Sequence, residues 1–277
     1  MNTKKLSAAF VIRHLLLAVF LLLTLYPLFW LSLCAFRSEG DALQRPLGLP
    51  AQWTLANLRE VLHSGNFAQA YLNSLLVCVV AVLICITCAT MAAYAFARFN
   101  FRGKNWLYML FLLGLMIPVH VTLIPLNQLL GADMLRLKGG LAALIGPYAG
   151  FGLPVSILIL RRAFEALPAE LLDAAALDGC SNLQVFWHVG LPLAKPALNT
   201  VLIFNFLTMW NEYAFALTLL GPGRQTVPLA ISEFKGEFDL RITVVCAALL
   251  LVMIPLICVY ACAQKQIIRG LTAGAIK

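Results

Sequence analysis

The sequence predicts an all-α membrane protein with six transmembrane helices and both termini in the cytoplasm. Of its 277 residues, 62% are hydrophobic and only 12% are charged, whereas a soluble domain carries charge at about 25% of its positions. Six long stretches lack Asp, Glu, Lys and Arg, except that the fifth contains Glu212. Each exceeds the roughly 20 residues with which a helix crosses the hydrocarbon. We therefore expect one transmembrane domain over residues 1–277.

The predicted spans follow one another along the whole chain. They cover residues 15–36, 61–97, 105–132, 139–160, 196–223 and 242–264. Pro118, Pro125 and Pro255 fall inside them and are expected to kink helices, because proline removes a backbone hydrogen bond. The first stretch follows Lys4 and Lys5 as in a signal peptide. It is longer than a signal peptide's apolar region, so we expect an uncleaved first helix.

The basic residues predict the orientation. With the N-terminus inside, the inner segments hold 12 of the 20 Lys and Arg residues and four acids, which gives +8, the net charge of the whole chain. An excess of Lys and Arg on one side is typical of the cytoplasmic face. We expect this positive charge to contact anionic membrane lipid rather than nucleic acid.

The cysteines and histidines do not form a recognisable metal site. Seven of the eight cysteines lie in apolar stretches, where a thiol packs as a small hydrophobic group. Cys85-x-x-Cys88 has metal or redox spacing, but no second pair accompanies it. The four histidines have no ligand spacing. We expect neither a metal site nor catalytic residues.

The longest inner connection, residues 161–196, contains signals for two short helices. Pro168 suits a first helical turn, and Gly179 suits the left-handed position that follows a helix. Ser181 and Gln184 have the spacing of a capping box that begins a second helix. That helix is expected to end before Pro192.

One face of this second helix is expected to be apolar, because Leu183, Phe186, Trp187 and Gly190 recur at helical spacing. A helix this short is unstable alone and needs a surface to pack on. The face suits a groove on a partner protein or the inner helix ends of the chain itself, and the pattern favours neither.

The same loop resembles the signature of ABC importer permeases. That signature reads Glu-Ala-Ala, three residues, Gly, nine residues, Ile-x-Leu-Pro. Here it appears as Asp173-Ala174-Ala175, then Gly179, then Val189-Gly190-Leu191-Pro192. Both intervals have the same length as in the signature. Asp173 replaces the Glu of the signature, and Val189 replaces its Ile. The shorter acid puts in doubt any contact that the family's Glu would make.

Other segments resemble the carbohydrate branch of this family, in particular the shorter six-helix subunit of maltose-type systems. They are residues 92–98, 116–118, 123–126, 178–179, 210–212 and 270–274. The resemblance therefore runs from the first helix to the C-terminus. It implies the type I ABC importer permease fold.

The resemblance implies that residues 161–196 form a coupling loop docked on a separate ATPase subunit. The residues implied in coupling are Asp173, Ala174, Ala175, Asp178, Gly179, Leu183, Phe186, Trp187, Leu191 and Pro192. The implied assembly, in the bacterial cytoplasmic (inner) membrane, adds a second permease, which makes a heterodimer, two ATPase subunits and an extracytoplasmic solute-binding protein. This chain lacks a Gly-x-x-x-x-Gly-Lys-Ser/Thr loop. ATP and Mg are thus expected on the partner ATPase, with no cofactor on this chain.

A sugar or oligosaccharide is the implied substrate. Polar residues inside spans are costly unless they face the bundle interior or water, and they also tie helices together. The candidates for the substrate path are Asn73, Thr87, Thr90, Tyr94, Asn127, Gln128, Tyr148, Asn205, Asn211 and Tyr213. Glu212 could line the path or meet the binding protein, but a solvated position at the outer interface is favoured.

Three functions other than sugar import predict different sequence features. An ABC permease for another solute, such as a polyol phosphate or an amino acid, would share the loop. An ion-coupled secondary transporter needs intramembrane charges and often an internal repeat, and Glu212 alone is thin support. A membrane-embedded enzyme needs a motif such as His-Glu-x-x-His, which the sequence lacks.

Overall fold

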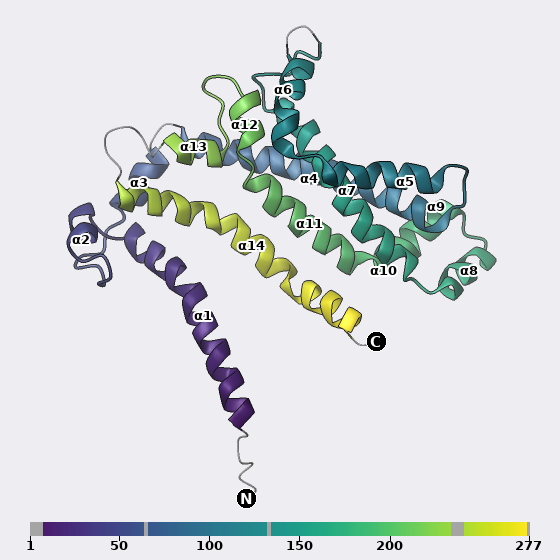
Figure 1. Ribbon diagram of the computed structural model, residues 1–277, viewed down its shortest axis with the longest axis horizontal. Helices are drawn as coiled ribbons and strands as arrows, with labels where there is room; N and C mark the ends of the chain where they lie inside the picture. The colour runs from purple at the N-terminus through teal and green to yellow at the C-terminus, as the bar shows by residue number, and fades with distance from the viewer. Residues whose placement is uncertain (1–7, 64–65, 132–133, 234–240, 276–277) are drawn as a thin grey trace, which may run out of the picture. The chain divides into compact units, whose positions relative to one another are not determined.

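The computed structural model describes residues 8–63, 66–131, 134–233 and 241–275 (Figure 1). In this part of the chain the regular elements are helices, and one isolated bridge joins Gly139 and Leu220. The predicted all-α class is confirmed. Three of the basic residues used to predict the orientation, Lys4, Lys5 and Lys277, lie outside the described residues.

The chain packs as two compact units. Unit 1 comprises Met1–Phe67 and Ile231–Ile254, and unit 2 comprises Ala68–Ala230 and Pro255–Lys277. Unit 1 contains α1 (Ala8–Ala35), α2 (Glu39–Gln44), α3 (Ala56–His63) and the first part of α14 (Ile242–Ala275). Unit 2 is built from α4 (Phe67–Arg98), α5 (Lys104–Leu113), η1 (Gly114–Met116), α6 (Val119–Leu130), α7 (Ala142–Glu165), α8 (Ala169–Leu177), α9 (Asn182–Val185), η2 (Phe186–Gly190), α10 (Leu191–Leu193), α11 (Lys195–Trp210), α12 (Ala214–Leu219) and most of α13 (Val227–Glu233).

Four helices are long and apolar enough to cross a membrane. They are Phe10–Ala35, Phe67–Arg98, Ala142–Glu165 and Ile242–Cys262. Two further pairs are sharply bent: Lys104–Met116 meets Val119–Leu130 at 103°, and Asn182–Leu193 meets Lys195–Trp210 at 73°. The described residues thus provide four candidate spans, or six if each bent pair is one span.

Two predicted spans are interrupted for identifiable reasons. In residues 105–132, Ile117 and Pro118 both adopt extended conformations, since a residue before proline is pushed away from the helical region. The kink expected at Pro118 is therefore a complete break between two helices. In residues 196–223, α11 ends at Trp210, and the Glu212 carboxylate then accepts from the Phe215 and Ala216 amides at 2.8 and 3.3 Å, at the start of α12. Pro125 and Pro255 lie within α6 and α14.

A buried polar cluster joins α4, α7 and α11 in the core of unit 2. The Asn205 side-chain amide donates to Ser156 Oγ and to the Val201 carbonyl, both at 2.8 Å. Cys85 Sγ lies 3.7 Å from Asn205 Oδ1 and 3.6 Å from Ser156 Oγ. Because buried polar groups cost free energy unless they are hydrogen-bonded, this cluster fixes how the three helices are rotated about their axes.

Gly152 provides the space for this cluster. A Cβ atom at residue 152 would meet the Asn205 side chain and would lie 2.8 Å from Cys85 Sγ. We expect Gly152→Ala to destabilise the protein by about 1–3 kcal/mol through overpacking and to lower its melting temperature in detergent. Gly150→Ala, whose Cβ would have no neighbour within 4 Å, is the matched control on the same helix. Equal melting temperatures for the two variants would contradict this prediction.

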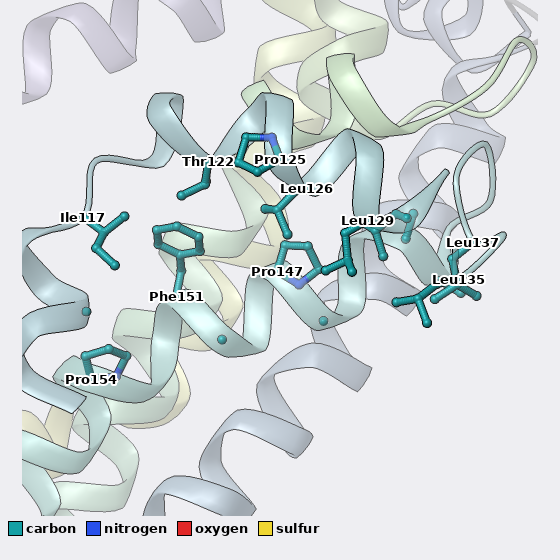
Figure 2. A pocket seen from close by; sticks show the side chains of 16 residues that line it. Ile117, Thr122, Pro125, Leu126, Leu129, Leu135, Leu137, Pro147, Phe151 and Pro154 are labelled. Atoms are coloured by element: carbon teal, nitrogen blue, oxygen red, sulfur yellow. The ribbon is translucent and has the colours of Figure 1, made fainter. Parts of the chain in front are cut away.

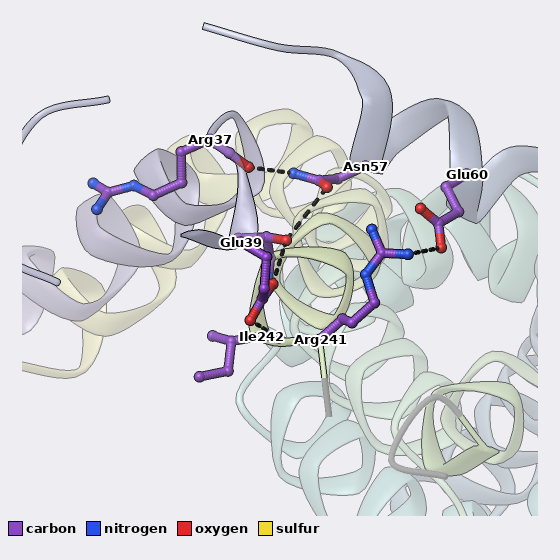
Figure 3. Close-up of polar contacts among 7 residues, drawn as sticks. Arg37, Glu39, Asn57, Glu60, Arg241 and Ile242 are labelled. Atoms are coloured by element: carbon purple, nitrogen blue, oxygen red, sulfur yellow. Dashed lines mark hydrogen bonds and ion pairs between the residues drawn. The ribbon is translucent and has the colours of Figure 1, made fainter. Parts of the chain in front are cut away.

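Unit 1 is held by polar contacts between the segment after α1 and the start of α14 (Figure 3). Glu39 accepts from the Ile242 amide at 3.1 Å and from the Thr243 amide and hydroxyl at 3.0 and 2.7 Å. Asn57 donates to the Ala35 and Arg37 carbonyls, and Arg241 pairs with Glu60 at 2.6 Å. A carboxylate at a helix N-terminus is stabilising, so Glu39 caps α14.

Acid pH is expected to weaken this cap. Burial raises the pKa of the Glu39 carboxyl, but hydrogen bonds from Thr243 and Ile242 and the charge of Arg241 outweigh it, so the pKa is lowered. The cap thus stabilises unit 1 above the unfolded pKa of about 4.3, and this stability is lost as the pH falls through the lower folded pKa. Thermal unfolding should show the wild type more stable than Glu39→Gln at pH 7. A stability difference that does not narrow as the pH falls below about 4.3 would contradict this prediction.

Candidate functional site

The segment from α8 to α10 lies at the opposite end of unit 2 from α12 (Figure 1). Its first helix, α8, ends in a closed backbone motif. Gly179 has φ +87°, its amide donates to the Ala176 carbonyl at 3.0 Å, and the Cys180 amide donates to the Ala175 carbonyl at 3.1 Å. These two bonds form a Schellman motif, which requires a residue with positive φ. The predicted left-handed role of Gly179 is confirmed.

The second helix begins with the predicted capping box. The Gln184 amide donates to Ser181 Oγ at 3.4 Å, and the Ser181 amide donates to Gln184 Oε1 at 2.8 Å. The predicted end before Pro192 is wrong, because helical structure continues through α10 to Leu193. Residues 186–190 form a π-helical turn, in which the Leu191 amide donates to the Phe186 carbonyl five residues earlier. The Ala194 amide again donates to a carbonyl four residues earlier, that of Gly190. Pro192, which has no backbone N–H, therefore lies where the π-helical hydrogen-bond pattern changes to the α-helical one.

One side of this second helix packs into the core of unit 2. Phe186 is only 6% exposed, and its ring centre lies 4.8 Å from that of Tyr94 and 6.5 Å from that of Phe164. Gly190 lies against the same Tyr94 ring, where an added Cβ would come within 3.1 Å. Edge-to-face aromatic pairs stabilise such contacts beyond their buried area. Phe186 and Gly190 therefore anchor the loop to α4 and α7.

The other side of the helix is open. Leu183 is 65% exposed and Trp187 is 55% exposed, and Asp173, Asp178 and Gly179 are exposed on and after α8. The single apolar face expected from helical spacing is thus divided between two directions. Consecutive helical residues point about 100° apart, which separates Phe186 from Trp187, and the wider π-turn also moves Gly190 away from the side of Leu183. We name Leu183 and Trp187 the outward pair.

Arg98 holds the start of the loop to the end of α4. Its Nη2 donates to the carbonyls of Phe164 at 2.6 Å and Leu167 at 3.0 Å, at the C-terminal end of α7, where the last helical carbonyls have no amide partner four residues on. A cation at a helix C-terminus also interacts favourably with the helix dipole. No structural role for Arg98 was predicted, although a basic residue in the last turn of a helix is a sequence signal for contacts with helix C-terminal carbonyls.

Removing this contact should loosen the loop. We expect Arg98→Ala to raise hydrogen exchange in residues 164–190 by about tenfold or more, because hydrogen bonds from a charged group contribute about 1.5–3 kcal/mol each. Hydrogen-exchange mass spectrometry of the purified protein measures this directly. Arg102→Ala, which removes an exposed charge nearby, is the control. Similar exchange in the two variants would show that Arg98 does not restrain the loop.

Most of the polar residues predicted for a substrate path have internal partners. Asn73 donates to the Gln225 carbonyl at 2.9 Å, and Asn127 donates to the Thr218 carbonyl at 3.3 Å. Tyr94 lies in the aromatic core, and Thr90 donates to the Ile86 carbonyl. The exposed candidates are Thr87, Gln128, Asn211 and Tyr213, of which Asn211 donates to the carbonyl of Leu207 on its own helix.

Tyr148 and Asn205 meet Glu212 at a small cavity. The Tyr148 hydroxyl donates to Glu212 Oε2 at 2.9 Å, and Thr208 also lines this space of about 80 Å³. Ligand pockets usually measure about 300–1,000 Å³, so the cavity is too small for a sugar. The Glu212 carboxylate is not simply solvated, because it accepts hydrogen bonds from the Tyr148 hydroxyl and from the Phe215 and Ala216 amides of α12.

A larger cavity of about 610 Å³ lies between α7 and the bent pair formed by α5–η1 and α6 (Figure 2). Its lining is almost wholly apolar and includes Ile117, Leu126, Leu129 and Phe151. Sugar hydroxyls need hydrogen-bonding partners, and burying them without partners costs free energy. Neither cavity alone therefore suits a sugar. Among the described residues, no group of three or more His, Cys, Asp or Glu side chains could hold a metal ion.

The comparisons with protein families and curated proteins agree with one another. Residues 85–272 match the family described as binding-protein-dependent transport system inner membrane component. The chain is 38% identical to a putative ABC transporter permease protein of Caldicellulosiruptor sp., over 94% of each chain. It is 30% identical to a diacetylchitobiose uptake system permease protein of Streptomyces coelicolor, over 96% of this chain and 88% of that protein.

A solved structure has the same fold over nearly the whole chain. It belongs to a bacterial ABC transporter involved in the import of the acidic polysaccharide alginate. The TM-score is 0.79 at 25% identity, and the match covers 96% of this chain and 98% of that one. Residues 161–196 and the helices that hold them are therefore part of a known architecture.

Proposed function

Since the chain belongs to the family of binding-protein-dependent transport system inner membrane components, we propose that it carries a sugar or oligosaccharide through the membrane as one permease of an ABC importer. Relatives support the sugar class: they are named for the uptake of diacetylchitobiose, starch degradation products and alpha-glucosides. The alginate importer supports the same class.

In the proposed assembly the outward pair docks on an ATPase subunit, which uses ATP and Mg. The observation that carries this role is the division of the loop, with Phe186 and Gly190 held in the core while Leu183 and Trp187 are open. An exposed Trp beside an exposed Leu suits a hydrophobic groove on a partner. Because Arg98 and Phe186 tie the loop to α4 and α7, movement of the docked loop would be transmitted to both helices.

A second permease and a solute-binding protein complete the proposal. The cavity beside α7 is apolar and the cavity at Glu212 is small, so we infer that a second permease, in a heterodimer with this chain, contributes polar surface to the sugar path. Counting each bent pair as one span gives six spans. An even number of spans would put both termini on one side, and the excess of Lys and Arg in the inner segments supports the cytoplasm as that side.

Reconstitution tests the function. The chain, its second permease, its ATPase subunits and its binding protein would be placed in liposomes with a panel of radiolabelled oligosaccharides. We expect uptake that needs both ATP on the loop side and the binding protein on the other side. Uptake driven by an ion gradient without ATP would overturn the proposal, and uptake of amino acids but of no saccharide would overturn the sugar assignment.

A further inference from the structure

A polar cavity lies at the turn between α4 and α5, on the proposed cytoplasmic side. Its volume is about 380 Å³. Lys104, Asn105, Trp106 and Arg161 line it together with residues of the turn before α5. The cavity lies within unit 2 and is separate from the outward pair.

The cavity carries unused positive charge. Arg161 is held in place, since its Nε donates to Glu165 Oε1 at 2.7 Å and its guanidinium carbon lies 3.9 Å from the Tyr108 ring centre. Within the described residues, its Nη groups and the Lys104 ammonium have no hydrogen-bond or ion-pair partner given by the structure. Lys104 and Arg161 are both positively charged, and in this part of the described chain the Glu165 carboxylate pairs only with Arg161, so the cavity favours an anion.

The backbone adds donors of the same kind. Gly103 has φ +84° and precedes the ten-residue helix α5, whose first turn has no side-chain cap. The Lys104 amide donates to the Phe101 carbonyl at 3.3 Å, which leaves the Asn105 and Trp106 amides of this first turn without a carbonyl partner four residues back. The positive end of the helix dipole also favours an anion. These two amides follow Lys104 in the chain, so backbone and side-chain donors are available to the same anion.

The surroundings of the cavity match a membrane interface. Trp106 is 73% exposed, and Leu107, Leu110 and Leu113 on α5 are also exposed. Tryptophan is enriched where the hydrocarbon meets the headgroups, while exposed leucines suit acyl chains. We propose that this cavity binds the phosphate of an anionic phospholipid, with Lys104 and Arg161 at the phosphate oxygens and the acyl chains along α5. The assignment rests on the proposed orientation.

Native mass spectrometry of the complete importer tests the site. The complex would be purified with phosphatidylglycerol or phosphatidylcholine as the added lipid, and lipid retained would be counted for the wild type and for a Lys104→Gln, Arg161→Gln variant. We expect retention of phosphatidylglycerol to fall by roughly thirtyfold in the variant, since two basic residues near an anionic surface together contribute about 2 kcal/mol. Phosphatidylcholine should be retained weakly by both.

Arg102→Gln with Arg162→Gln is the matched control, because it removes the same charge from exposed neighbours that do not line the cavity. Equal loss in the two double variants would overturn the site and indicate general surface attraction. Displacement of the lipid by millimolar inorganic phosphate would overturn the lipid assignment. ATP-driven sugar uptake, measured on the same preparations, reports separately on the proposed function, and a normal elution profile would show that the variant folds.

Discussion

Trp187→Ala, combined with Leu183→Ala, is expected to abolish ATP-driven uptake while the protein still inserts in the membrane. Both side chains are more than half exposed, and Trp187 meets the core through the Phe186 ring, with the ring centres 5.3 Å apart, so their loss should leave unit 2 folded. Aromatic anchors at interfaces commonly contribute about 2 kcal/mol or more, which corresponds to roughly thirtyfold weaker binding of the ATPase subunit. Co-purification of that subunit with the permease measures the loss.

Two variants make this test specific. Trp53→Ala removes an equally exposed tryptophan from the segment between α2 and α3, and it should retain the ATPase subunit in full. Phe186→Ala should instead lower the melting temperature, because it removes a buried ring from the contact with Tyr94. Full recovery of the ATPase subunit with the Trp187 and Leu183 double variant would contradict docking through the outward pair.

Gly179→Val is the second change with a large expected effect. An L-residue in the left-handed region costs about 1–2 kcal/mol, and a β-branched residue costs more. The Schellman motif at the end of α8 would open, and α8 would lose its fixed direction relative to the capping box at Ser181. We expect uptake to fall by at least about tenfold at normal membrane levels of the protein.

Gly179→Asn is the matched control, since asparagine enters the left-handed region more readily than other L-residues. It should keep most of the uptake. No side chain lies within 4 Å of a Cβ placed on Gly179, so backbone conformation, rather than crowding, distinguishes the two variants. Equal uptake by the Val and Asn variants would contradict the role of the left-handed turn.

The local features of the loop were predictable because neighbouring residues determine them. Gly179 and the pair Ser181–Gln184 act through backbone groups at most a few positions away, and both predictions are confirmed. The all-α class followed from long uncharged stretches in the same way. These features require no knowledge of what packs against the helix.

The features that were not predicted depend on distant residues or on unusual backbone. Tyr94 was a candidate for the substrate path, but it packs against Phe164 and Phe186, which lie far along the chain. Composition does not reveal the 103° break between η1 and α6, because the residues on both sides are equally apolar. The π-turn was missed since hydrophobic spacing assumes 3.6 residues in every turn.

The π-turn has a consequence for how the loop can change in evolution. It places one more residue in a turn than an α-helix does, so the number of residues between Gly179 and Pro192 sets how the capped start of the second helix is rotated relative to α11. Losing or gaining one residue would rotate one end against the other by about 100°. Phe186 and Gly190 could then no longer meet the Tyr94 ring while the outward pair kept its open direction. A change in the length of this segment is therefore expected to be more damaging than a substitution at one of its exposed residues.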